Sequence, residues 1–187
     1  MAQMGREWQT LRELVDLHHH SEERYVHPLL AQAIPGGRRP YDEEHRAITV
    51  MLDDLQGHLG RLVNDGSVAD RPDVGREFYL GVNRFYAEFL AHLDREETQA
   101  QRALNELYPP EVLAATLQTI IGGFSPDDLM LFIDIMFPAM ILPEAAGLLG
   151  SIRLPPEALA PLTERARQAL GEARWTQLQA RLPVPVR

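Results

Sequence analysis

Apolar residues recur at spacings of three and four through most of this 187-residue chain, and no stretch sustains the polar–apolar alternation of a strand. Such spacing places apolar side chains on one face of an α-helix. Segments rich in proline, glycine and other turn formers interrupt the pattern at residues 34–40, 64–73, 107–111, 122–128, 142–144 and 154–157. The sequence therefore predicts an all-α protein.

The three longest predicted helices come first, at residues 5–33, 41–64 and 72–106, and four shorter helices follow Pro109. Ser125, followed by a proline and two aspartates, is a typical helix N-cap. We expect an up-down bundle of three long helices in residues 1–107. We expect residues 108–187 to pack on that bundle or to form an oligomer interface, such as that of a homodimer. The apolar residues of this region are Leu129, Phe132, Ile133, Ile135, Met136, Phe137 and Met140.

The composition excludes several classes of partner and cofactor. A formal charge of −9 argues against nucleic acid or an anionic membrane surface, because both need a basic surface. The chain has no cysteine, so disulfides, iron–sulfur clusters and thiolate metal ligands are excluded. The N-terminal residues carry no export signal, and the most apolar run, 129–142, is too short for a bilayer span. We expect a cytoplasmic protein.

Histidine and glutamate interrupt the apolar stripes of all three long helices. The first stripe comprises Trp8, Leu11, Val15, His18, Glu22, Tyr25 and Leu29; the second His45, Ile48, Leu52, Leu55, Leu59 and Leu62; the third Phe78, Val82, Phe85, Phe89, His92 and Glu96. Residues four apart on a helix share a face. Two HxxxE pairs and one further histidine are therefore predicted to point into one bundle.

Burying these groups without partners would be unfavourable. An unpaired buried carboxylate costs several kcal/mol, which is comparable to the net stability of a domain. A metal centre would remove that cost, because imidazole and carboxylate suit iron, manganese and zinc, and a carboxylate can bind two ions at once. Five inward ligands are many for one tetrahedral zinc. They favour a dinuclear site such as the diiron centres of helical bundles.

Other interpretations of the same residues stay open at this point. His19 with Glu23 competes with the first HxxxE pair, and Glu97 competes with Glu96 as the partner of His92. A bundle with buried ion pairs and no metal is a further alternative. His20, His27 and His58 lie about 180° to 220° from the predicted ligands of their helices, so we expect them to face solvent.

Three segments together resemble the hemerythrin-like HHE cation-binding domain. They are "HHHSEERYVHPLL", "EEHRAITVMLDDL" and "FLAHLDREETQAQRAL", and the resemblance covers about residues 1–107. It implies a helical bundle whose pattern runs His, HxxxE, His, HxxxE. Transferred to this chain, His18 and Glu22 match the first HxxxE, His45 the lone histidine, and His92 and Glu96 the second HxxxE.

One part of the family pattern has no counterpart here. No histidine precedes His18, so the first family helix and its ligand are missing from the sequence given. A late start of the sequence would explain why this helix is missing. Alternatively, a C-terminal helix or a partner chain would take its place in the bundle. We expect a metal site that is open on one side.

The resemblance implies a non-haem metal protein, with two irons that bind or sense dioxygen, nitric oxide or peroxide; zinc and manganese fit the same donors. No other set of converging groups is evident, so a carrier, store or sensor is favoured over an enzyme. A diiron oxidase or peroxidase is one alternative. A metal-free helical interaction module, with the C-terminal region as its functional surface, is the other.

Overall fold

The computed structural model describes residues 2–64 and 71–182, and these residues form helices with no strand among them. The all-α prediction is thus confirmed. The predicted turn at 64–73 falls largely on residues 65–70, which lie outside the described residues. No helix in the described part of the chain is both long and apolar enough to cross a membrane.

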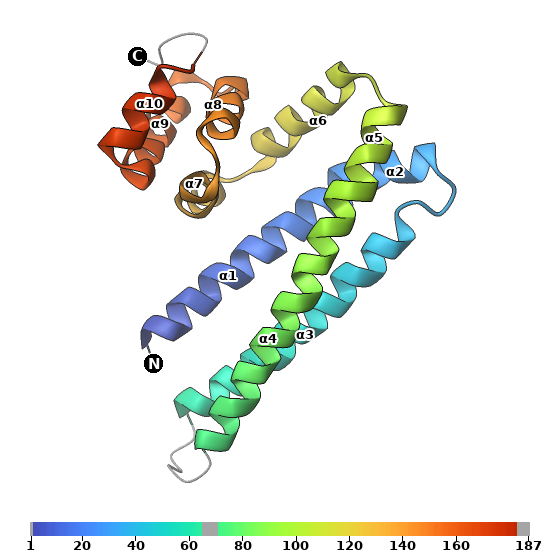
Figure 1. The fold of residues 1–187 in the computed structure, drawn as a ribbon, viewed down its shortest axis with the longest axis vertical. Helices are drawn as coiled ribbons and strands as arrows, with labels where there is room; N and C mark the ends of the chain where they lie inside the picture. Colours follow the sequence, from blue (N-terminus) through green and yellow to red (C-terminus); the bar gives the residue numbers. More distant parts are fainter. Residues whose placement is uncertain (1, 65–70, 183–187) are drawn as a thin grey trace. The chain divides into compact units, whose positions relative to one another are not determined.

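Three long helical segments run up and down, as Figure 1 shows. The first consists of α1 (Ala2–Ser21), η1 (Glu22–Val26) and α2 (His27–Ala33), the second is α3 (Arg39–Asn64), and the third consists of α4 (Arg71–Arg95), η2 (Glu96–Ala100) and α5 (Gln101–Leu107). These bounds agree with the predicted helices within a few residues. The sequence did not predict that η1 and η2 are π-helical turns within the first and third segments.

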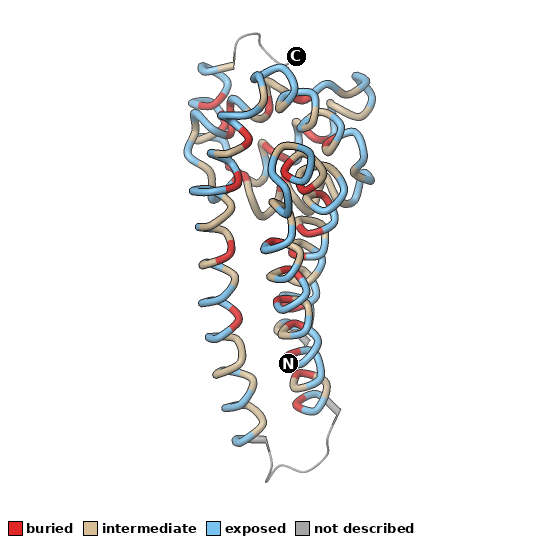
Figure 2. Tube along the Cα trace, turned by 90° about the vertical axis from the view of Figure 1, so that its right-hand side faces the viewer, coloured by how far each residue is buried: buried red, intermediate tan, exposed pale blue. Residues whose placement is uncertain are grey.

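The core of the long helices comes from the predicted apolar stripes. Figure 2 shows buried residues along the long helices, and the innermost side chains are Val15 of α1, Ile48 and Leu52 of α3 and Phe85 of α4. Helices α3 and α4 lie side by side (Figure 1) and pack closely at Gly81, where a Cβ atom would lie 2.7 Å from Leu55 Cδ2.

The shorter helices are α6 (Pro110–Gly123), α7 (Pro126–Ala139), α8 (Leu142–Ser151), α9 (Pro156–Leu170) and α10 (Glu172–Gln179). The predicted N-cap at Ser125 is present. Its hydroxyl accepts a hydrogen bond from the backbone N–H of Asp128, whose carboxylate accepts one from the Ser125 N–H. We predicted four helices here, but the described residues up to 182 form five, because Gly171 adopts φ +74° and separates α9 from α10.

The chain divides into two compact units, Met1–Leu113 and Ala114–Arg187. The second unit has a core of its own, in which Ile133, Phe137 and Leu162 are buried. Leu129, Phe132 and Met140 pack against that core, so part of the apolar surface predicted for an interface is used within the unit. Two assignments stay predictions: metal binding by the first unit and dimerisation through the second unit.

Candidate metal centre

Five polar side chains converge where the long helices of the first unit meet. We call His18, Glu22, His45, His92 and Glu96 the His/Glu cluster; each offers a ligand atom, and these atoms all lie within 4.8 Å of one another. They come from α1, η1, α3, α4 and η2. The structure thus brings together all five residues that the sequence singled out.

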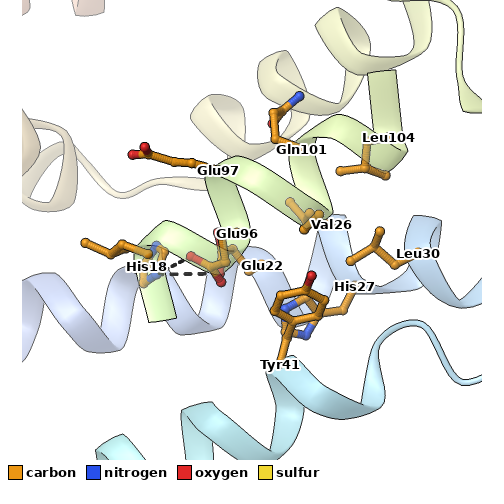
Figure 3. A pocket seen from close by; sticks show the side chains of 12 residues that line it. His18, Glu22, Val26, His27, Leu30, Tyr41, Glu96, Glu97, Gln101 and Leu104 are labelled. Carbon is orange, nitrogen blue, oxygen red and sulfur yellow. Dashed lines mark ion pairs between the residues drawn. The ribbon is translucent and has the colours of Figure 1, made fainter. Parts of the chain in front are cut away.

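The two glutamates lie between the histidines. Glu96 Oε1 is 3.1 Å from His92 Nε2 and 3.6 Å from His45 Nε2, and Glu22 Oε2 is 3.4 Å from His45 Nε2. His18 Nε2 is 3.5 Å from a carboxylate oxygen of each glutamate, as the dashed lines in Figure 3 show. Each carboxylate therefore faces more than one imidazole, as a bridging ligand does.

The atoms that face the centre of the cluster lack hydrogen-bond partners. They are His18 Nε2, His45 Nε2, His92 Nε2, Glu22 Oε2 and Glu96 Oε1; all are buried, and their mutual contacts do not have hydrogen-bond geometry. Leaving one buried polar group unsatisfied costs about 1 to 3 kcal/mol, and more if it is charged. Imidazole nitrogen with carboxylate oxygen is the donor set of iron, manganese and zinc sites, so these residues fit a metal centre.

The pKa values follow from the crowding of opposite charges. Burial would lower the pKa of His45, but the carboxylates of Glu22, Glu96 and Glu23 outweigh it and raise the pKa to about 9. Burial likewise opposes a charged His92, and Glu96 and Glu44 raise its pKa. Without a metal, these histidines bind protons that a metal ion would have to displace.

The two carboxylates shift in opposite directions. Burial is the main cause that raises the pKa of Glu22. Burial acts on Glu96 in the same sense, but the close imidazoles of His18, His45 and His92 outweigh it and lower the pKa of Glu96. At neutral pH the metal-free cluster therefore holds an anionic Glu96 beside a protonated His45, and a metal ion would take the place of that proton.

Two further carboxylates hold the outer nitrogens of the deepest histidines. Glu23 Oε1 lies 3.1 Å from His45 Nδ1, and Glu44 Oε2 lies 2.9 Å from His92 Nδ1. Arg95 Nε is 2.7 Å from the other oxygen of Glu44. A carboxylate on one imidazole nitrogen fixes the ring and directs the other nitrogen at a metal. Sequence reasoning missed Glu44 because it lies 48 residues from His92.

Comparison with known proteins agrees with this geometry. A family model, described as the hemerythrin HHE cation binding domain, matches residues 1–104. The chain belongs to the hemerythrin HHE family. No curated protein and no solved structure matches it.

The π-helical turns lie at the two glutamates of the His/Glu cluster. The turn η1 begins at Glu22 and η2 begins at Glu96. A π turn closes i→i+5 rather than i→i+4 hydrogen bonds and occurs often at functional sites. Both Glu22 and Glu23, consecutive residues at the start of η1, reach His45: Glu22 Oε2 lies near Nε2 and Glu23 Oε1 near Nδ1.

The extra residue of the π turn corrects our prediction for His27. We expected it to face solvent, but it is only 1% exposed, and its ring centroid lies 4.9 Å from that of His45. One additional residue in the helix turns everything after it by about 100°, which brings His27 inward. His27 Nδ1 lies 2.8 Å from Asp42 Oδ1, and Arg38 donates to both oxygens of that aspartate.

The remaining histidines differ in how far they are exposed and in whether they lie near the His/Glu cluster. His19, which we considered only as a competing ligand, is 6% exposed and has a ligand atom close to those of His18, His45 and His92. Burial, and secondarily these histidine neighbours, lower its pKa to about 2. His20 is exposed, as predicted. His58 is half-buried beside Glu77, away from the cluster. The alternative partner Glu97 is exposed, so Glu96 is the residue that faces His92.

A pocket of about 240 Å³ adjoins the His/Glu cluster. His18, Glu22 and Glu96 line one end, while apolar residues, among them Val26, Leu30 and Leu104, line the other. In Figure 3 the Tyr41 ring lies over His27 with its hydroxyl directed towards the pocket. The pocket thus lies next to three members of the cluster. That the site is open where the first family helix is missing stays a prediction.

Proposed function

We propose that this chain binds two iron ions in a carboxylate-bridged site and uses them to bind or sense dioxygen, nitric oxide or peroxide. His18, His45 and His92 would be terminal ligands, and Glu22 and Glu96 would bridge the ions. The observation that carries this proposal is the convergence of five ligand atoms within 4.8 Å, all buried and without hydrogen-bond partners. The family match supports cation binding by the same region.

The choice of two ions rests on the carboxylates. Glu96 faces three histidines and Glu22 faces two, so neither is paired with a single imidazole. A single tetrahedral ion would leave part of this donor set unused. Helical bundles that hold two irons use inward glutamate and histidine in the same way. Zinc and manganese accept the same donors and are the competing metals.

The protein would contribute a rigid and largely dry site. Bound reduced iron would supply the redox chemistry and a coordination position for the small ligand. His45 and His92 are held by Glu23 and Glu44 behind them, which limits their movement. The apolar end of the pocket would exclude bulk water, and its opening would admit a ligand of a few atoms.

A diiron peroxidase is the second candidate function, and the pocket favours it. The Tyr41 hydroxyl and the carboxylates of Glu22 and Glu96 give that pocket polar groups next to the cluster. Turnover of hydrogen peroxide by the iron-loaded protein would support a peroxidase. Binding without turnover would support a carrier or sensor.

Metal analysis tests the proposal directly. The untagged protein is loaded with Fe²⁺ under anaerobic conditions, desalted and analysed for elemental content, together with His92→Ala and the control His20→Ala. We expect about two irons per chain in the wild type and in His20→Ala, because His20 is exposed, and loss of iron in His92→Ala. One tightly bound zinc would refute the diiron site. No metal in any variant would leave the metal-free helical module.

A further inference from the structure

We propose that His19 is a sixth protein ligand of the metal centre. Its nitrogen would give both ions the same number of histidine ligands. This inference rests on the proposed dinuclear site. It concerns a residue that the sequence offered only as an alternative to His18, in the competing pair of His19 with Glu23. The sequence alone presents His19 as one of three consecutive histidines.

The placement of His19 is that of a ligand. Its side chain is more deeply buried than that of His18, and its Nε2 atom is buried without a hydrogen-bond partner. His19 offers a ligand atom within 4.8 Å of those of His18, His45 and His92. A buried nitrogen without a hydrogen-bond partner needs a cation or a proton donor, and no described residue provides a donor to His19 Nε2.

Helix geometry explains how two consecutive histidines reach one site. Neighbouring residues are about 100° apart on an α-helix, so both reach the interior when the inward direction falls between them. His20, a further step of about 100° away, is exposed. The inward direction of α1 at this level therefore lies between His18 and His19.

The number of donor atoms available to each ion indicates what His19 would contribute. Each Nε2 atom binds one ion, so three histidines would give one ion two nitrogens and the other a single nitrogen. With His19, each ion would have two histidine nitrogens in addition to the carboxylates of Glu22 and Glu96, which would make four protein donors for each. Such a set leaves positions open on an iron ion that prefers five or six ligands, and the pocket beside His18 gives access to them.

A packing role is the alternative for His19. Its ring stacks on that of His45, with centroids 3.8 Å apart and planes at 13°. Stacking needs a flat ring but no nitrogen. His19→Phe retains a flat ring and removes the nitrogen, and it therefore separates the two roles.

The test is an anaerobic Fe²⁺ titration of the full chain, with bound iron measured by elemental analysis. The variants are His19→Phe, His19→Ala and the adjacent exposed control His20→Ala. We expect His19→Phe and His19→Ala to bind one iron as before and the second at least on the order of 10-fold more weakly, whereas His20→Ala binds two. Two irons bound by His19→Phe as tightly as by the wild type would overturn the inference and leave the diiron proposal intact. A wild type that binds no metal would refute both.

A second measurement does not depend on the folding of any variant. In the zinc-loaded wild type, two-bond ¹H–¹⁵N correlation spectra report the state of each imidazole nitrogen of the seven histidines. We expect the Nε2 resonance of His19 to shift on zinc binding in the same sense as that of His92, and that of His20 to stay unchanged. An unshifted His19 Nε2 alongside a shifted His92 Nε2 would exclude His19 as a ligand.

Discussion

The pKa of His45 makes the stability of the metal-free protein depend on pH. Its pKa is about 9 in the folded chain, against about 6.5 for an ordinary histidine. The folded state thus binds more protons than the unfolded state between these values, so the free energy of unfolding falls as the pH rises through this window. Below pH 6.5 the contribution of His45 is fully present, and above pH 9 it is lost.

We expect the chelator-treated protein to lose about 1 to 3 kcal/mol of unfolding free energy between pH 6.5 and 9. Urea unfolding followed by circular dichroism measures this loss. His45→Gln should remove most of the slope, because glutamine does not titrate. A stability that rises with pH over this window in the metal-free wild type would contradict the assignment.

A core residue of the bundle offers a second prediction at this scale. Phe85 is fully buried between α1, α3 and α4, so Phe85→Ala should cost about 3 to 5 kcal/mol of unfolding free energy. The next residue, Tyr86, is half exposed, and Tyr86→Ala should change that free energy by only about 0.5 kcal/mol. Chemical denaturation measures both. Equal losses would mean that α4 is rotated from its described position.

At the scale of the helical elements, the outer carboxylates connect helices that are distant in sequence. Glu44 precedes His45 on α3, yet its carboxylate contacts His92 of α4. Glu43, its neighbour, is exposed and forms an ion pair with Arg39 on the same helix. Glu44 is therefore suited to test the contact with His92, and Glu43 serves as its control.

Glu44→Gln should weaken metal binding by about 10- to 100-fold, because the His92 ring loses the carboxylate that orients it. Glu43→Gln should leave the affinity unchanged. Competition with a chelator of known affinity measures both dissociation constants. A wild-type affinity in Glu44→Gln would show that the contact with His92 is not needed to hold the metal ligand.

At the scale of the whole molecule, the two compact units should respond differently to metal. All residues of the His/Glu cluster lie in the first unit, Met1–Leu113. A ligand that binds only the native state stabilises the part that holds it. We expect metal to slow hydrogen exchange in α1, α3 and α4 and to leave α7 to α10 unchanged. Equal protection of both units, read by mass spectrometry of peptides, would mean that they unfold as one.

Dimerisation through the second unit is also a prediction. Ile133 and Phe137 are buried in its own core, but Ile141 is largely exposed and offers apolar surface. Light scattering should give about twice the chain mass of 21.1 kDa, and Ile141→Glu should give the monomer mass. A monomeric wild type would exclude the interface.

The sequence by itself determined the helices and the five residues of the His/Glu cluster. Both follow from local rules: apolar spacing defines a helix face, and His18 with Glu22, or His92 with Glu96, share a face because they are four residues apart. His45 heads the stripe of its helix in the same way. These predictions need no knowledge of how one helix lies against another.

The tertiary structure decided what surrounds the cluster. The π turns at Glu22 and Glu96 change the rotation of the following residues, which is why His27 faces inward against the prediction. The contacts of Glu23 with His45 and of Glu44 with His92 join residues 22 and 48 positions apart. A helical period describes one helix in isolation, whereas the second carboxylate behind each imidazole, and the depth of His19, depend on how the helices pack.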